Sequence, residues 1–246
     1  MGRDAGMPPK GLRPRGAGLH PPALTPAYRS SIARAPHHPP IAIGGTAESL
    51  HGPVFGHGDI APDEANLLAG YGSGGAPIGE RIIVHGRLLD GSGRPVPGAL
   101  IEIWQANSAG RYRHPGDRHD APLDPAFSGC GRTLSGADGS YSFRTIRPGA
   151  YPWPNGGNDW RPAHIHFSVF GTAFAQRLVT QMYFEGDPLI PRCPIVATLP
   201  DPAAVTRLVG RLDMDASIPF DALAYRFDIV LRGHEATPFE TRPEGN

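Results

Sequence analysis

The sequence predicts an all-β protein: a β-sandwich of mainly antiparallel strands with long loops, an extended N-terminal arm and one or two short helices. Its 246 residues include 33 Gly and 29 Pro, a composition rich in turns. Short runs of β-branched and aromatic residues recur along the chain, and turn signals separate them. Only one segment begins with a strong helix-start signal. Together these features favour a sandwich over a helical fold.

Six runs are expected to form strands. Residues 81–89 end at the Asp-Gly-Ser-Gly turn signal of residues 90–93, which leads into a second strand at residues 99–104. Further strands are expected at residues 141–145, 163–170, 177–184 and 226–231. The runs 163–170 and 177–184 should pair with each other across a turn at Gly171.

The N-terminal arm is predicted to span residues 1–45, and the sandwich domain residues 46–246. The arm is rich in Pro and Arg, has little periodicity and cannot build a core of its own. Its one aromatic anchor is Tyr28. A helix is expected to begin at Asp201 as its N-cap, with Pro202 in the first turn, and to run through residues 203–212. A second short helix is expected at residues 63–69.

The composition excludes several classes of protein. The formal net charge is zero, so nothing indicates binding to nucleic acid or to an acidic membrane surface. No run of about 18 apolar residues predicts a transmembrane helix. Residues 1–10 are polar, unlike a signal peptide, so we expect a cytoplasmic protein. Cys130 and Cys193 have neither disulfide nor metal-site spacing, and we expect two reduced thiols.

A His-x-His pair lies in the run at residues 163–170. Successive side chains of a strand point to opposite faces, so Ile165, Phe167 and Val169 should share the core face. His164 and His166 should then share the other face, close enough to bind one metal ion. Paired histidines on a strand also occur as ordinary surface residues, so this motif is only moderately specific.

Two tyrosines in turn-rich segments make the motif more informative. Tyr112 follows the strand expected at residues 99–104, and Tyr151 lies in a Pro-rich segment at residues 147–153. Taken singly, each is more often a packed aromatic than a ligand. Zinc sites use Cys, His and carboxylate ligands, and ferrous oxygenases use two His and a carboxylate. A phenolate is a hard anionic donor that suits Fe(III) better, so the four side chains together indicate a ferric enzyme.

Much of the chain resembles a known family. It resembles the intradiol catechol dioxygenases with non-haem Fe(III), and in particular the family of protocatechuate 3,4-dioxygenase β subunits. The resemblance covers residues 21–240, and it includes the four donor residues. The other matching segments are residues 23–34, 77–84, 121–125, 158–162, 184–191 and 223–233.

The resemblance implies a role for each of ten residues. Tyr112 and His164 would be equatorial ligands of Fe(III), and Tyr151 and His166 axial ligands. Arg161 would lie over the bound catechol, and Gln181 would join it as a catalytic residue. The positions that line or approach the substrate cavity would be Tyr28, Trp104, Trp153 and Ile195.

The resemblance also implies a reaction and a partner. The substrates would be protocatechuate and O2, and the product the ring-opened 3-carboxy-cis,cis-muconate. Fe(III) with two tyrosinates and one hydroxide is neutral, which suits a largely dry pocket. A catechol dianion would replace the hydroxide and the Tyr151 phenolate, and these two bases would take its protons. A homologous α subunit would complete the pocket, forming αβ units in a higher oligomer.

Three other interpretations compete with this one. A homodimeric intradiol dioxygenase acting on catechol or hydroxyquinol would share all four ligands, but usually has a helical N-terminal region. A metal-free β-sandwich that binds small ligands would need neither both tyrosines nor both histidines. A zinc hydrolase would need a Cys or carboxylate ligand that the sequence does not offer at a suitable position.

Overall fold

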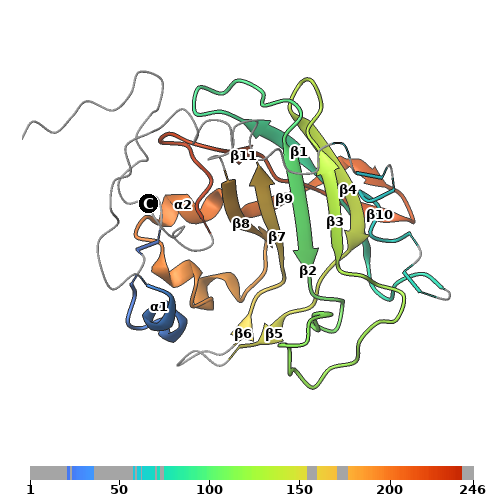
Figure 1. The fold of residues 1–246 in the computed structure, drawn as a ribbon, viewed down its shortest axis with the longest axis horizontal. Coiled ribbons are helices and arrows are strands. Elements are labelled where there is room, and N and C mark those ends of the chain that lie inside the picture. The colour runs from blue at the N-terminus through green and yellow to red at the C-terminus, as the bar shows by residue number, and fades with distance from the viewer. Residues whose placement is uncertain are drawn as a thin grey trace, which may run out of the picture.

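The computed structural model describes residues 21–22, 24–35, 58, 60–61, 63–69, 71–72, 75–153, 160–170 and 177–239. Within these ranges the protein consists mainly of strands (Figure 1). The strands are β1 (Arg81–Leu89), β2 (Leu100–Gln105), β3 (Cys130–Leu134), β4 (Ser140–Ile146), β5 (Tyr151–Pro152), β6 (Trp160–Arg161), β7 (His164–Phe170), β8 (Arg177–Phe184), β9 (Val209–Ile218), β10 (Ala222–Arg226) and β11 (Ile229–Val230). The helices are α1 (Arg29–Arg34) and α2 (Pro202–Thr206), with 3-10 turns η2 (Ile190–Arg192) and η3 (Val196–Thr198).

The strands form two layers that meet through β9. The hydrogen-bonded order is β11-β1-β10-β9-β8-β7-β2-β3, with β4 paired to β1. One part of β9 runs parallel to β8, and its later residues pair antiparallel with β10. Most other pairs are antiparallel, except that β1 is parallel to β10 and β11. The predicted sandwich of mainly antiparallel strands is confirmed.

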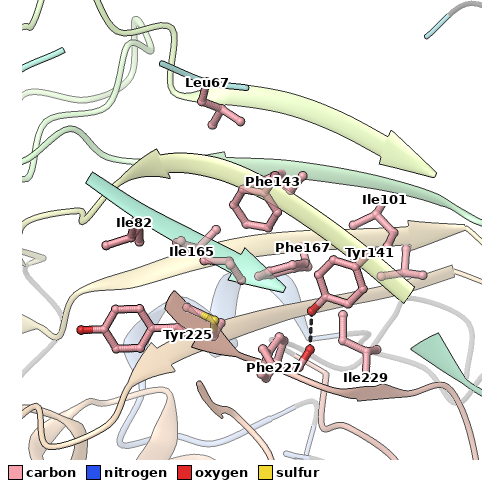
Figure 2. Close-up of a cluster of buried hydrophobic side chains, with 14 of the residues drawn as sticks. Leu67, Ile82, Ile101, Tyr141, Phe143, Ile165, Phe167, Tyr225, Phe227 and Ile229 are labelled. Atoms are coloured by element: carbon pink, nitrogen blue, oxygen red, sulfur yellow. Dashed lines mark hydrogen bonds between the residues drawn. The ribbon is translucent and has the colours of Figure 1, made fainter. Parts of the chain in front are cut away.

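The hydrophobic core lies between the two layers (Figure 2). Phe143 on β4 and Phe167 on β7 meet edge to face with ring centroids 5.8 Å apart, and Phe227 packs on Phe167 at 5.3 Å. The hydroxyl of Tyr141 donates a hydrogen bond to the carbonyl of Phe227, so the one polar group of this aromatic cluster is satisfied. The core face of β7 was predicted correctly, since Ile165, Phe167 and Val169 are all fully buried here.

Five of the six predicted strands match with shifts of at most one residue at each end. These are β1, β2, β4, β7 and β8. The pairing of β7 with β8 is confirmed, although the turn at Gly171 lies outside the described residues. The last strand was predicted as one run at residues 226–231, but in the structure β10 ends at Arg226 and only Ile229–Val230 of this run form a further strand, β11. Between them, the Phe227 amide donates to the carbonyl of His85, whereas the Arg87 amide donates to the side chain of Asp228 instead of to a backbone carbonyl.

The helix predicted over residues 203–212 is wrong beyond its first turn. The side chain of Asp201 accepts a hydrogen bond from the Ala203 amide, as predicted, but α2 ends at Thr206. The amides of Tyr183 in β8 and of Glu185 just after it donate to the carbonyls of Leu208 and Gly210, which draws this segment into the sheet as β9. Tertiary pairing therefore overrides the local helical preference.

The helix predicted at residues 63–69 is also wrong. This segment forms turns and one isolated bridge to β4, between Asn66 and Arg144. The amide of Leu67 donates to the carbonyl of Arg144, and the Arg144 amide donates to the carbonyl of Ala65. Because these backbone groups bond to an adjacent strand, they are not available for helical hydrogen bonds.

Among the residues predicted to form the N-terminal arm, Tyr28 packs beside the C-terminal end of β8. Tyr28 precedes α1, is 4% exposed and belongs to a hydrophobic cluster with Tyr183 of β8 and Leu208. In Figure 1, α1 and α2 lie on this same side of the molecule. The rest of the arm predicted at residues 1–45 lies outside the described residues. None of the helices in the described ranges is long and apolar enough to cross a membrane.

Candidate metal centre

Strand β7 presents two histidines on the face opposite to the core. His164 and His166 are 1% and 7% exposed, and their ring centroids lie 4.9 Å apart. Directly paired residues share a face of a sheet, and His166 pairs with Trp104 on β2 and with Gln181 on β8. Trp104 stacks on His166 with its ring centroid 4.8 Å away and the planes 3° apart. The ladder thus fixes the positions of both imidazoles.

Tyr112 comes from the loop that follows β2, and two side chains hold that loop. Buried Asn107 accepts hydrogen bonds at Oδ1 from the Ala109 and Arg111 amides, and its Nδ2 donates to the Pro122 carbonyl at 2.9 Å. The Tyr112 amide itself donates to Oδ2 of Asp117 at 2.7 Å. A segment without regular pairing is therefore fixed by bonds between side chains and its own backbone.

Tyr151 is held by a close crossing of two loops. The Gly149 amide donates to the carbonyl of Asn107 at 2.9 Å, which joins the Tyr151 loop to the Tyr112 loop. A Cβ on Gly149 would overlap the carbonyl oxygen of Ser108 and lie 2.7 Å from the Gly110 nitrogen. Gly110 has a φ of 78° and faces the carbonyl of Ala150. Only glycines allow the two backbones to approach this closely.

The four predicted donors converge on one point. The hydroxyl of Tyr112 lies 3.0 Å from Nε2 of His166 and 3.4 Å from Nε2 of His164. The hydroxyl of Tyr151 lies 3.2 Å from the same His164 nitrogen, and the two phenol rings meet edge to face with centroids 5.4 Å apart. Among the described residues, no group of three or more His, Cys, Asp or Glu gathers as a metal site. A metal ion at this point would therefore need the two phenols as ligands in addition to the two imidazoles.

The protonation of His164 is set by its surroundings. Its Nδ1–H donates to the carbonyl of Pro162 at 2.7 Å, in the tautomer that leaves the Nε2 lone pair facing the two phenols. Burial, the Arg161 guanidinium and His166 together hold the pKa of His164 well below its ordinary value. The imidazole is accordingly neutral, which is the form that coordinates a metal ion.

A buried polar cluster adjoins the four donors. The guanidinium of Arg161, 1% exposed, donates to Oε1 of Gln181 and to the hydroxyl of Tyr183 at 3.3 Å. Tyr183 donates in turn to Oε1 of Gln181 at 2.8 Å, and burial raises the pKa of Tyr183 well above its usual range. Sequence reasoning missed Tyr183, although strand alternation places it on the same face as Gln181.

Two cavities open on the donor cluster. The larger has a volume of about 560 Å³, within the usual size for a small-molecule site, and is lined by Tyr112, Gly116, Asp117, Arg118, His119, Asp120, Tyr151, Pro152, Trp153, Arg161 and His166. The smaller, of about 350 Å³, is lined by Trp104 and Cys130 among others, and it shares Tyr112, Asp117, Tyr151 and His166 with the larger.

The four residues predicted to line or approach the substrate cavity occupy different places. Trp153 forms part of the larger cavity's wall, and the Arg161 guanidinium lies 5.1 Å from its ring centroid. Trp104 lines the smaller cavity. Tyr28 packs edge to face behind Trp153 at 5.7 Å, and Ile195 is buried in the same cluster.

Comparisons with known proteins identify the family. A family model described as Dioxygenase matches residues 50–233, and one described as Protocatechuate 3,4-dioxygenase beta subunit N terminal matches residues 13–46. The protocatechuate 3,4-dioxygenase beta chain of Burkholderia cepacia is 51% identical over 229 residues, which cover 93% of this chain and 97% of that relative. The chain belongs to the family of protocatechuate 3,4-dioxygenase β chains. It is thus an intradiol dioxygenase, of a family that generally uses non-haem iron.

More distant dioxygenases match a smaller part of the β chain. Catechol 1,2-dioxygenase 1 of Acinetobacter lwoffii is 36% identical over 168 residues, which cover 60% of this chain and 49% of that relative. Among solved structures, catechol 1,2-dioxygenase from Acinetobacter sp. ADP1, inhibited by bound mercury, is 28% identical with a TM-score of 0.50. The match covers 68% of this chain and 56% of that one. This chain spans about half the length of these catechol enzymes, with which it shares the sandwich.

Proposed function

We propose that the chain is the iron-bearing β subunit of an enzyme that cleaves protocatechuate with O2 to 3-carboxy-cis,cis-muconate. Fe(III) would be bound by Tyr112, Tyr151, His164 and His166. The observation that carries the proposal is the convergence of two phenols and two imidazoles at the base of a cavity large enough for a catechol. The 51% identity to a protocatechuate 3,4-dioxygenase beta chain supports the choice of substrate.

The donor set fits Fe(III) by charge and by chemical type. Two phenolates and two neutral imidazoles contribute two negative charges, and a hydroxide would bring the ferric site to neutrality, which suits buried surroundings. Bound there, Fe(III) would be chelated by the two catechol oxygens and would withdraw electron density from the ring. Zinc is a poorer match, because its sites draw on Cys, His and carboxylate.

The protein's own groups would move the protons and stabilise charge. The phenolate oxygen of Tyr151 would accept one of the two catechol protons and become a neutral phenol, and the hydroxide would take the other and become water. The guanidinium of Arg161 stays charged and would stabilise negative charge on the ring. Nε2 of buried Gln181 has no hydrogen-bond acceptor among the described residues, so this donor is available to an oxygen atom in the pocket.

A homologous α subunit would complete the enzyme. The name of the Burkholderia cepacia relative as a beta chain supports an αβ assembly. Large apolar side chains that a partner could cover include Ile78 at 71% and Met214 at 65% exposure. We also propose that residues 1–45 act as an arm appended to the sandwich domain of residues 46–246, which would hold the iron site.

The test is the visible absorption spectrum of the chain co-expressed with its α partner, before and after protocatechuate is added without oxygen. We expect a broad tyrosinate-to-ferric band that shifts when the catechol chelates the metal. A colourless protein that contains stoichiometric zinc, or no metal, would rule the proposal out. Cleavage of catechol or hydroxyquinol in preference to protocatechuate would instead support a catechol-type enzyme, although those relatives match less of this chain.

A further inference from the structure

Arg161 reaches the donor cluster from a strand of only two residues. Its backbone pairs with Tyr151 in the short β5–β6 ladder. Its long side chain has several rotatable bonds, so this pairing alone does not determine where the guanidinium lies. The guanidinium lies 5.1 Å from the ring centroid of Trp153, and it donates to Oε1 of Gln181 and to the hydroxyl of Tyr183. Its position therefore depends on the groups that it contacts.

Tyr183 has much firmer support from the backbone. It pairs with His164 on β7 and with Val209 on β9, so regular strands hold it on both sides. Its amide also donates to the carbonyl of Leu208 at 2.7 Å. The side chain is fully buried and packs in a hydrophobic cluster. The hydroxyl of Tyr183 is thus a fixed point in the interior beside the donor cluster.

Three hydrogen bonds join Arg161, Gln181 and Tyr183 in a closed triangle. A guanidinium only donates, so the atom of the Gln181 amide that faces it must be the oxygen. This Oε1 accepts from Arg161 and, at 2.8 Å, from the hydroxyl of Tyr183. The same hydroxyl accepts from Arg161 at 3.3 Å. Because two donors meet at Oε1, the orientation of the amide is determined, and Nε2 is the atom left for other partners.

We propose that Tyr183 is a positioning residue for ring cleavage, whose hydroxyl holds the Arg161 guanidinium and the Gln181 amide in one fixed arrangement. The inference rests on the proposed function, in which these two groups act on the bound catechol. In the part of the chain that the structure describes, Tyr183 does not line either cavity on the donor cluster. It would therefore act through its two neighbours and not by contact with the substrate.

This role predicts a change in rate without a matching change in binding. The catechol would be bound through its two oxygens at the four donors, which Tyr183 does not hold. The guanidinium would act on negative charge that develops later, as the ring reacts. Loss of the Tyr183 hydroxyl should therefore slow the reaction of a bound catechol more than it weakens the binding.

The experiment compares two Tyr→Phe variants of the complete enzyme with its partner. Tyr183→Phe removes one hydroxyl from the triangle and leaves the ring. Tyr141→Phe is the matched control, because Tyr141 is also buried and its hydroxyl donates to the carbonyl of Phe227 in the hydrophobic core. Protocatechuate is bound without oxygen, its dissociation constant is measured, O2 is admitted, and ring cleavage is followed over a single turnover.

Tyr183→Phe should lower the rate of cleavage about tenfold, the size expected for one hydrogen bond to a charged group. Its dissociation constant for protocatechuate should change by no more than about twofold, since the four donors are untouched. Tyr141→Phe should lower the temperature of unfolding but leave the rate and the dissociation constant unchanged.

Two further measurements test the route of the effect. Tyr183→Phe should cost less in a Gln181→Leu background than in the parent, because residues that act through one another are not additive. Crystal structures provide a readout that does not depend on activity. The guanidinium of Arg161 should be displaced, or adopt two conformers, in Tyr183→Phe and keep its position in Tyr141→Phe.

Several outcomes would overturn the role of Tyr183. These are an unchanged rate in Tyr183→Phe, an equal fall in Tyr141→Phe, and full additivity with Gln181→Leu. Weaker binding at an unchanged single-turnover rate would also contradict it, since Tyr183 would then support binding alone. A parent enzyme that binds protocatechuate without cleaving it would contradict the proposed function instead, and the crystal structures would still show whether Tyr183 positions Arg161.

Discussion

The four donors of the candidate metal centre come from two kinds of structure. His164 and His166 project from β7, whose backbone is paired on both sides by β2 and β8. Tyr112 comes from a loop and Tyr151 from the two-residue strand β5. These segments have little or no regular pairing, and Asn107, Asp117 and a crossing at two glycines hold them together with the short β5–β6 pairing. The strand positions its ligands by regular hydrogen bonding, whereas the loops depend on individual side chains. Substitutions in the two regions should therefore affect protein stability and bound iron differently.

The largest effect on folding should come from the core face of β7. Phe167 is fully buried and contacts three other aromatic rings. Phe167→Ala should lower the free energy of unfolding by about 3–5 kcal/mol, measured by urea denaturation. His166→Gln, on the opposite face, should reduce bound iron but destabilise the metal-free protein less. If the histidine change destabilised it more, the two faces of β7 would not have separate roles.

A smaller effect is expected where the two loops cross. Gly149→Ala places a Cβ against the backbone of Ser108 and Gly110, so we expect a loss of about 3 kcal/mol, the upper range for overpacking. Bound iron should fall as well, because the tyrosines must separate. Gly93→Ala is the control: its φ is 78° and nothing lies within 4 Å of a Cβ, so it should cost stability without loss of iron. Equal iron content in both variants would contradict the positioning role of the crossing.

Asn107 tests whether one side chain organises the Tyr112 loop. Asn107→Ala removes three side-chain hydrogen bonds and should cost about 2 kcal/mol, since the freed backbone groups are partly buried. Asn107→Asp keeps both accepted bonds and loses only the donor to Pro122, so it should recover part of the iron content and of the tyrosinate absorption band. Identical spectra for the two variants would show that loop geometry does not depend on Oδ1.

The smallest effect should come from the N-cap of α2, which is not part of the metal centre. The Asp201 carboxylate accepts the Ala203 amide at 2.9 Å and caps α2. Asp201→Ala should cost about 1 kcal/mol in thermal or urea unfolding and leave the bound iron unchanged. Loss of iron in this variant would show that any decrease in stability perturbs the site. Iron content could then no longer distinguish the strand that carries the histidines from the loops that carry the tyrosines.

Prediction from the sequence also differed between the strand that carries the histidines and the segments that carry the tyrosines. Alternation along residues 163–170 correctly placed three apolar side chains in the core and both histidines on the other face, because the period of two is a direct consequence of strand geometry. The tyrosines follow no period, and the residues that support them act through backbone amides. Their convergence was therefore expected from the chemistry of the donor set and from the resemblance to a family, and not from any period in the sequence.

The errors also have physical causes. Residues 203–212 follow a correct N-cap signal, but pairing of Val209 and Gly210 with β8 prevails over the helical start. Tyr183 could have been recognised, because alternation along β8 puts it beside Gln181 in the row of polar residues.

The short pairing of β5 with β6 has a consequence for the rate at which the phenol of Tyr151 can move. Tyr151 pairs with Arg161 in this ladder, and two residues earlier the Gly149 amide is bonded to Asn107. The backbone of Tyr151 is thus held on both sides, and its phenol can change position only by rotation about side-chain torsions. Such rotations are much faster than the opening of a loop. If an incoming molecule displaced the phenol of Tyr151, the backbone would not need to open. The rate of the displacement would then be set by side-chain rotation and proton transfer.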